Sequence, residues 1–287
     1  LGVQPVEGLG VADRGEAGVG LEEQEFAERC RARGFQTIQV ESQPSAGQGV
    51  EAGAIGFGGF IGRGRGTDGG VGGLEGDRRW AFVRDGVEQS GFPWLTLRQR
   101  GDMSHYRPYF SDPGRPDTSP TRVRTPAGEV LDVTDPALAA ELFAAGARVI
   151  RQNRGVFDAF PLSLITTQTV TRLGEQVGVE LDVQRFRPNI LVEPASGEPF
   201  TEDEWVGLTL RIGGMCMRVD KRDGRCVVIT IDPATGLRSP EILKAVVDER
   251  QGCLGVYGST VEEGRVAVGD AVLLDPPDPP LVSPRRR

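Results

Sequence analysis

From residue 74 onward, short apolar runs alternate with polar positions and are separated by turn residues. Runs of this length, rich in valine, isoleucine, threonine and aromatic residues, are typical of β-strands. Pro126-Ala127-Gly128 separates two such runs and predicts a hairpin. The pattern predicts strands over residues 79–84, 94–98, 121–125, 129–133, 161–166, 186–192, 208–212, 226–231, 254–257 and 265–274.

Three segments carry the apolar spacing of helices: residues 135–145, 167–177 and 239–250. Asp135 can cap the free N–H groups at the start of the first, and Pro136 suits its first turn. A few helices among many short strands predict a mostly β fold, in which a β-barrel carries peripheral helices.

Residues 1–72 hold about half of the chain's 41 glycines and show no sustained strand or helix period outside residues 21–33. We therefore expect a disordered or aberrant segment there, and a disordered proline-rich tail over residues 277–287. The run from Gly64 to Gly69 matches the dinucleotide-binding pattern GxGxxG. No helix pattern follows to hold a pyrophosphate, so we reject a nucleotide site.

The net charge of −8 argues against nucleic-acid binding and against an anionic membrane surface. No apolar run reaches the roughly 18 residues of a membrane span, and no secretory signal is present, so we expect a cytoplasmic protein. The four cysteines form no CxxC pair, and His105 is the only histidine. This composition argues against a disulfide framework, a structural zinc site and histidine-based acid–base catalysis.

Several segments in one order resemble the MOSC domain, named for the C-terminal part of molybdenum-cofactor sulfurase. They are RFRPNILVE (185–193), FTEDEWVGLTLRIG (200–213), GRCVVITIDPATG (224–236), PEILK (240–244) and VGDAVLL (268–274). Upstream, residues 73–86 and 95–100 resemble the N-terminal β-barrel domain that precedes MOSC in amidoxime-reducing proteins. The resemblance implies a MOSC β-barrel over residues 149–276, preceded over residues 73–148 by a smaller, partial β-barrel-like domain.

Cys226 matches the family position whose thiolate binds molybdenum. Soft sulfur donors suit this metal, and the deprotonated form is the one that binds. Arg225, Arg222 and Lys221 precede the cysteine and would stabilise its charged form. The alternative is a small core residue at the head of the predicted strand over residues 226–231. Core packing is the preferred interpretation for Cys216 and Cys253, and Cys30 receives no role.

The molybdenum cofactor also carries a pterin and a phosphate, which need forked donors and small hydroxyls. The residues that match the family's cofactor-holding positions are Arg78, Thr166, Thr169, Arg187, Asn189, Gly224 and Arg225. Thr166 and Thr169 stand at the start of a predicted helix, where anions bind readily.

Two departures from the family pattern matter. Asp223 stands where many relatives have a second cysteine, which argues against a two-cysteine redox mechanism. The family's proline–valine–lysine motif has only the echo PVEGLG (5–10), with Glu7 in place of the lysine. We hypothesise a reading-frame error upstream of Gly73, which the other two frames of the source DNA would reveal.

The resemblance implies a molybdenum-dependent oxidoreductase that reduces a small N-hydroxylated substrate by two electrons. The metal supplies the chemistry, and the protein positions it. The chain has no iron–sulfur cysteine set or haem motif, so we expect an external electron donor of the ferredoxin or flavoprotein type. The alternatives are a cofactor or sulfur carrier that uses a Cys226 persulfide, and a degenerate barrel that binds nothing.

Overall fold

The computed structural model describes residues 37–39, 63–64, 73–153, 155–157 and 159–275. Within the predicted disordered segment, only the short strands β1 (Thr37–Gln39) and β2 (Arg63–Gly64) are described. The rest of residues 1–72, including the helical pattern over 21–33, lies outside the described residues, as does the tail over 277–287.

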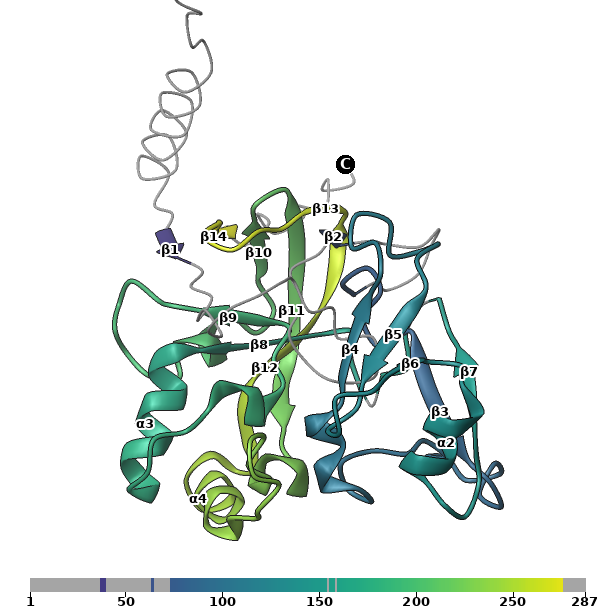
Figure 1. Cartoon of the computed structure of the whole chain (residues 1–287). Helices are drawn as coiled ribbons and strands as arrows, with labels where there is room; N and C mark the ends of the chain where they lie inside the picture. The colour runs from purple at the N-terminus through teal and green to yellow at the C-terminus, as the bar shows by residue number, and fades with distance from the viewer. Residues whose placement is uncertain (1–36, 40–62, 65–72, 154, 158, 276–287) are drawn as a thin grey trace, which may run out of the picture.

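The fold is mostly β, as predicted, and its largest part is a curved, barrel-like sheet (Figure 1). The strand order is β1-β14-β10-β11-β12-β8-β9, with antiparallel pairs except for the parallel pair β8–β9. The remaining bounds are β8 (Leu162–Thr166), β9 (Ile190–Val192), β10 (Thr209–Ile212), β11 (Met215–Gly224), β12 (Cys253–Glu262) and β14 (Ala271–Asp275). The short β13 (Gly264–Arg265) pairs with β2.

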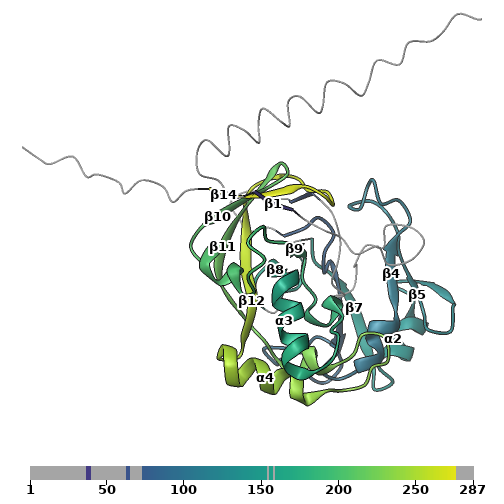
Figure 2. The same ribbon diagram turned by 90° about the vertical axis from the view of Figure 1, so that its left-hand side faces the viewer.

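Two apolar clusters lie on this sheet. One fills the interior of the curved sheet and includes Leu164, Trp205 and Leu210, which are all almost fully buried. The other packs helices α3 (Thr167–Val177) and α4 (Pro240–Arg250) against it, through residues such as Leu173 and Ile242. The rotated view shows both helices on the same side of the sheet (Figure 2). Among the helices of the described part of the chain, none has the length and apolar character to cross a membrane.

The N-terminal lobe consists of two small sheets, one α-helix and the 3-10 helix η1 (Gly101–His105), and it lies beside the large sheet (Figure 1). Its elements are β3 (Trp80–Arg84), β4 (Arg107–Phe110), β5 (Thr121–Arg124), β6 (Val130–Asp132), α2 (Pro136–Leu142) and β7 (Ala147–Arg151). β3 pairs with β7, and β4, β5 and β6 form a meander. The core of this lobe includes Phe82, Tyr106 and Leu138, and it also takes in Ile231 from the C-terminal part.

Local sequence signals located many of the elements but missed the strands β4, β7 and β11. The predicted helix over 167–177 and the predicted hairpin around Pro126-Ala127-Gly128 are confirmed. The strand predicted over 94–98 is wrong, because only Trp94 makes a bridge, to Val83, before the chain turns. The strand predicted over 226–231 is also wrong, because Val227–Thr230 forms the 3-10 helix η4.

Candidate cofactor site

Cys226 lies at the point where β11 ends and η4 (Val227–Thr230) begins. Its backbone is extended, at φ −130° and ψ −178°, and its side chain is half-buried. The Arg98 guanidinium comes from the N-terminal lobe and donates through Nη2 to the Cys226 Sγ, 3.4 Å away. The side chain is therefore not sealed in the core, and a cation faces its sulfur from the other lobe.

The three basic residues that precede Cys226 in the sequence direct their side chains elsewhere. Arg225 donates to the carbonyls of Leu254, at 2.7 Å, and Phe186, at 2.8 Å. Arg222 forms an ion pair with Asp203 at 3.0 Å, and Lys221 lies over the Phe160 ring. Sequence reasoning thus chose the wrong cations for the sulfur. The one that contacts it, Arg98, is 128 residues away in the sequence.

Asn189 joins the two lobes of the molecule. Its Oδ1 accepts from the Ser163 amide at 3.0 Å, and its Nδ2 donates to Asp77 Oδ2 at 3.0 Å. Asp77 is buried and also lies 3.7 Å from the Arg78 Nε. Two residues predicted to hold the cofactor, Arg78 and Asn189, are therefore held together by one buried carboxylate.

Arg78 and Arg187 share an uncommon backbone conformation. Their φ angles are 48° and 54°, and only Phe200 and Gln251 share this property among the described non-glycine residues. A side chain in this left-handed region costs roughly 1–3 kcal/mol and persists where its surroundings hold it, often at functional sites. Both arginines are among the residues predicted to hold the cofactor.

Asp223 is a second buried carboxylate of the site. Its Oδ2 lies 3.0 Å from the Arg225 Nη2, and the carboxylate is 1% exposed. Burial raises the pKa of Asp223, while the charges of Arg225, Arg78 and Lys221 and the adjacent Tyr257 hydroxyl oppose that rise. The pKa of Tyr257 is raised as well, by its own burial and by the Asp223 charge.

Thr166 and Thr169 are fully buried at the start of α3. Each hydroxyl lies 2.9 Å from the Glu202 Oε2, and the Thr169 oxygen also accepts from the Phe200 amide at 2.7 Å. The structure thus places both hydroxyls around an internal carboxylate and away from solvent. Gly224, in contrast, faces open space, since a Cβ there would meet no atom within 4 Å.

The structure thus connects Arg78, Arg187, Asn189, Gly224 and Arg225 to the Cys226 segment. Sequence reasoning missed the charged partners Arg98 and Asp77 and the Tyr257 hydroxyl, and it noted Asp223 only as a missing cysteine. Asp77 stands directly before Arg78 in the GDRRW segment, which is the only signal that could have identified it.

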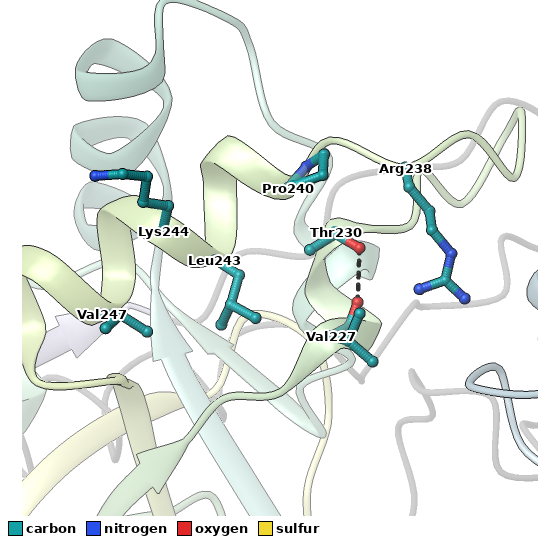
Figure 3. Close-up of a pocket in the computed structure, with 7 residues that line it drawn as sticks. All are labelled: Val227, Thr230, Arg238, Pro240, Leu243, Lys244 and Val247. Carbon is teal, nitrogen blue, oxygen red and sulfur yellow. Dashed lines mark hydrogen bonds between the residues drawn. The ribbon is translucent and has the colours of Figure 1, made fainter.

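An open apolar groove of about 370 Å³ begins at the residue after the cysteine (Figure 3). It runs between η4 and α4 and is lined by Val227, Thr230, Arg238, Pro240, Leu243, Lys244 and Val247. Val227 and Val247 are exposed, at 39% and 52% of their surface. The groove therefore presents apolar surface beside the Cys226 segment.

The side chains at the site fit a metal that takes most of its ligands from a cofactor. Among the described residues, no group of three or more histidine, cysteine or acidic side chains gathers to hold a metal ion. A metal at Cys226 would thus take one thiolate from the chain and its remaining ligands from a cofactor. Forked arginine donors and the Asn189 amide nearby suit the polar and anionic groups of such a cofactor.

Residues 151–273 match the family model described as the MOSC domain. Mitochondrial amidoxime-reducing component 1 from Danio rerio is 36% identical over 124 residues, 40% of this chain and 37% of the relative. Molybdenum cofactor sulfurase from the same organism is 40% identical over 77 residues, 26% of this chain and 9% of the relative. The chain thus matches well under half the length of either relative.

Among solved structures, the YUAD protein from Bacillus subtilis aligns with 84% of this chain and 96% of its own, at a TM-score of 0.41 and 12% identity.

Proposed function

Residues 151–273 of this chain form a MOSC domain, and on that premise we propose that the protein is a molybdenum-cofactor-binding oxidoreductase. In this proposal Cys226 is the protein's ligand to the metal, and a small N-hydroxylated compound is reduced by two electrons. An external ferredoxin or flavoprotein supplies the electrons. The observation that carries the proposal is the half-buried Cys226 sulfur, with the Arg98 guanidinium 3.4 Å from it.

The chain offers a distinct group for each part of the cofactor. Arg78, Arg187 and Asn189 would hold its pterin and phosphate by charge and hydrogen bonds. Gly224, two residues before Cys226, leaves open space around its own Cα. The cofactor, when bound, supplies the two-electron chemistry that the chain's own side chains lack.

Arg98 has a separate role in this proposal. Its side chain is exposed and also lies over the Phe92 ring, 5.0 Å from the centroid, which orients the guanidinium. A cation beside the ligand sulfur would bind the polar N–O group of the substrate and stabilise the negative charge that develops on the leaving oxygen.

The test is elemental analysis of the purified full chain, combined with a reduced-dye assay on an N-hydroxylated substrate. We expect the wild type to hold molybdenum and turn over, and Cys226→Ala to lose both. Arg98→Gln should keep its molybdenum and lose about tenfold in kcat/KM, the effect of about 1.4 kcal/mol of lost transition-state stabilisation.

The matched control for the ligand is Cys253→Ala, since Cys253 is also half-buried and lies opposite Gly224 on β12. It should retain both molybdenum and activity. A wild type without molybdenum, or an unchanged Cys226→Ala, would overturn the proposal.

A carrier function is the second candidate, and the similarity to molybdenum cofactor sulfurase favours it. An accessible Cys226 could carry sulfur as a persulfide or hold the cofactor for transfer. Molybdenum or labile sulfur without turnover in the same assays would support this candidate over the first.

A further inference from the structure

We propose that Asp223 is a positioning residue: as the buried counter-ion of Arg225, it fixes the guanidinium that holds the Phe186–Asn189 turn. This turn carries Arg187 and Asn189. The consequence for cofactor retention rests on the proposed function, whereas the ordering of the turn does not.

Arg225 connects three segments of the chain. Its Nη1 donates to the Phe186 carbonyl at 2.8 Å and its Nε to the Leu254 carbonyl at 2.7 Å, while its Nη2 lies 3.0 Å from Asp223. Its side chain is only 6% exposed, so water contributes little to holding it. The direction of this guanidinium is therefore set by hydrogen bonds to two carbonyls, while its Nη2, which has no hydrogen-bond partner, is compensated by the charge of Asp223.

Asp223 is the only one of these three partners that carries a full charge. A buried guanidinium loses its hydration, and removing its counter-ion leaves an uncompensated charge that two carbonyl dipoles offset in part. Arg78, Lys221 and Tyr257 also face Asp223, so the carboxylate balances more than one cation. Gly255 leaves room for the pair, because a Cβ there would lie 3.2 Å from Arg225 Nη2.

The turn needs this support because Arg187 holds a strained left-handed conformation directly after Phe186. Such a residue persists where its neighbours over-determine it. The Arg225 guanidinium binds the carbonyl before Arg187, and the Ser163 hydroxyl donates to the Arg187 carbonyl at 3.3 Å. Releasing Arg225 removes one of these two clamps.

The test is amide hydrogen exchange on the full chain without added cofactor, comparing wild type, Asp223→Asn, Arg225→Gln and the double variant. The reporters are the Arg187 and Asn189 amides, which donate to Gln184 and Ser163. We expect Asp223→Asn to speed their exchange by about tenfold while the β5–β6 hairpin stays protected. The double variant should exchange no faster than Arg225→Gln alone, because both changes release the same clamp.

The matched control is Asp220→Asn on the same strand, where the carboxylate pairs with Arg218 at 2.6 Å and Ser259 at 2.7 Å. It should leave both reporters unchanged. The proposal would be overturned if Asp223→Asn left the exchange rates of the two reporter amides unchanged, or if Asp220→Asn raised them equally. It would also be overturned if amides throughout the Asp223→Asn protein lost their protection.

A second readout is the molybdenum content of the same variants after purification and dialysis. Asp223→Asn should lose metal faster than Asp220→Asn if the turn holds the cofactor. A wild type without metal would count against the proposed function, while the exchange rates would still decide the role of Asp223.

Discussion

At the scale of single residues, Glu202 shows how a polar group can be used internally. Its carboxylate is fully buried. It accepts hydrogen bonds from the Thr166 amide and from the hydroxyls of Thr166 and Thr169. Burial raises the pKa of Glu202 in spite of these hydrogen bonds, which act in the opposite direction. The carboxylate thus connects the start of α3 to η3 (Thr201–Trp205). Its burial disfavours the charged form, so an ionised Glu202 lowers the stability of the folded state.

This cost predicts a pH-dependent stability that Glu202→Gln removes. Because the pKa of Glu202 in the folded state lies above its ordinary value of 4.5, the folded state binds more protons than the unfolded state at pH values between the two. The stability of the wild type relative to Glu202→Gln should be constant below about pH 4.5 and fall as pH rises through the folded-state pKa. The slope should not exceed about 1.4 kcal/mol per pH unit.

Urea unfolding of both proteins from pH 4 to 8 measures this difference. A constant difference in the free energy of unfolding carries no information, since glutamine also changes the hydrogen bonds. The prediction concerns the sign of the slope of this difference against pH. A difference that grows with pH would mean that Glu202 stabilises the fold as a carboxylate.

A family motif led to the candidate residues of the site, and no motif led to their partners. Cys226, Arg187 and Asn189 stand in segments that resemble a family. The carboxylate that binds the Asn189 amide is Asp77, 112 residues away, and no local pattern indicates that pairing. A hydrogen bond between distant segments depends on which segments the fold brings together, so sequence reasoning found Asn189 and missed Asp77.

At the scale of elements, local sequence determines where α3 begins and ends, whereas tertiary contacts determine the helical conformation of η4. Thr166 caps α3, and Gly178 ends it in a left-handed conformation, so both ends are encoded locally. The apolar run after Cys226 is typical of a strand. It forms a 3-10 helix whose last carbonyls, those of Ile229 and Thr230, accept from the buried Arg185 guanidinium at 3.3 and 2.9 Å.

Three glycines at the ends of the paired strands β11 and β12 allow a graded test of close packing at the site. A Cβ on Gly255 would lie 2.6 Å from the Leu164 carbonyl, at φ +73°. Gly252 has φ +77° but open space, and Gly224 has open space at an ordinary φ. We expect Gly224→Ala to change the free energy of unfolding by less than about 0.5 kcal/mol, Gly252→Ala to cost about 1 kcal/mol and Gly255→Ala about 3 kcal/mol.

Chemical denaturation of the three variants checks this order. The difference between the destabilisation by Gly255→Ala and that by Gly252→Ala gives the steric contribution, because both glycines have a positive φ and share the backbone strain. Equal costs for these two variants would show that β8 moves away freely, and that the packing around Arg225 is looser than the structure indicates.

At the scale of the whole molecule, the two lobes share both a core and a site. Ile231, the residue directly after η4, packs with Phe82, Tyr106 and Leu138 of the N-terminal lobe. The Asn189–Asp77 hydrogen bond and the Arg98–Cys226 contact cross the same boundary. The division predicted at residues 148 and 149 stays a prediction. A cofactor site that draws side chains from both lobes requires them to stay together.

This shared core predicts that the lobes unfold as one unit. Ile231→Ala removes a side chain that is 3% exposed and should destabilise the whole fold by about 2–5 kcal/mol, since it leaves a cavity between the lobes. Val247→Ala, at a position 52% exposed, should change stability by less than about 0.5 kcal/mol. Scanning calorimetry of the wild type should give one transition, which Ile231→Ala lowers without splitting. Two separate transitions in the wild type would mean that each lobe is stable alone, and the contacts of Ile231, Asn189 and Arg98 would then be too weak to hold the site closed.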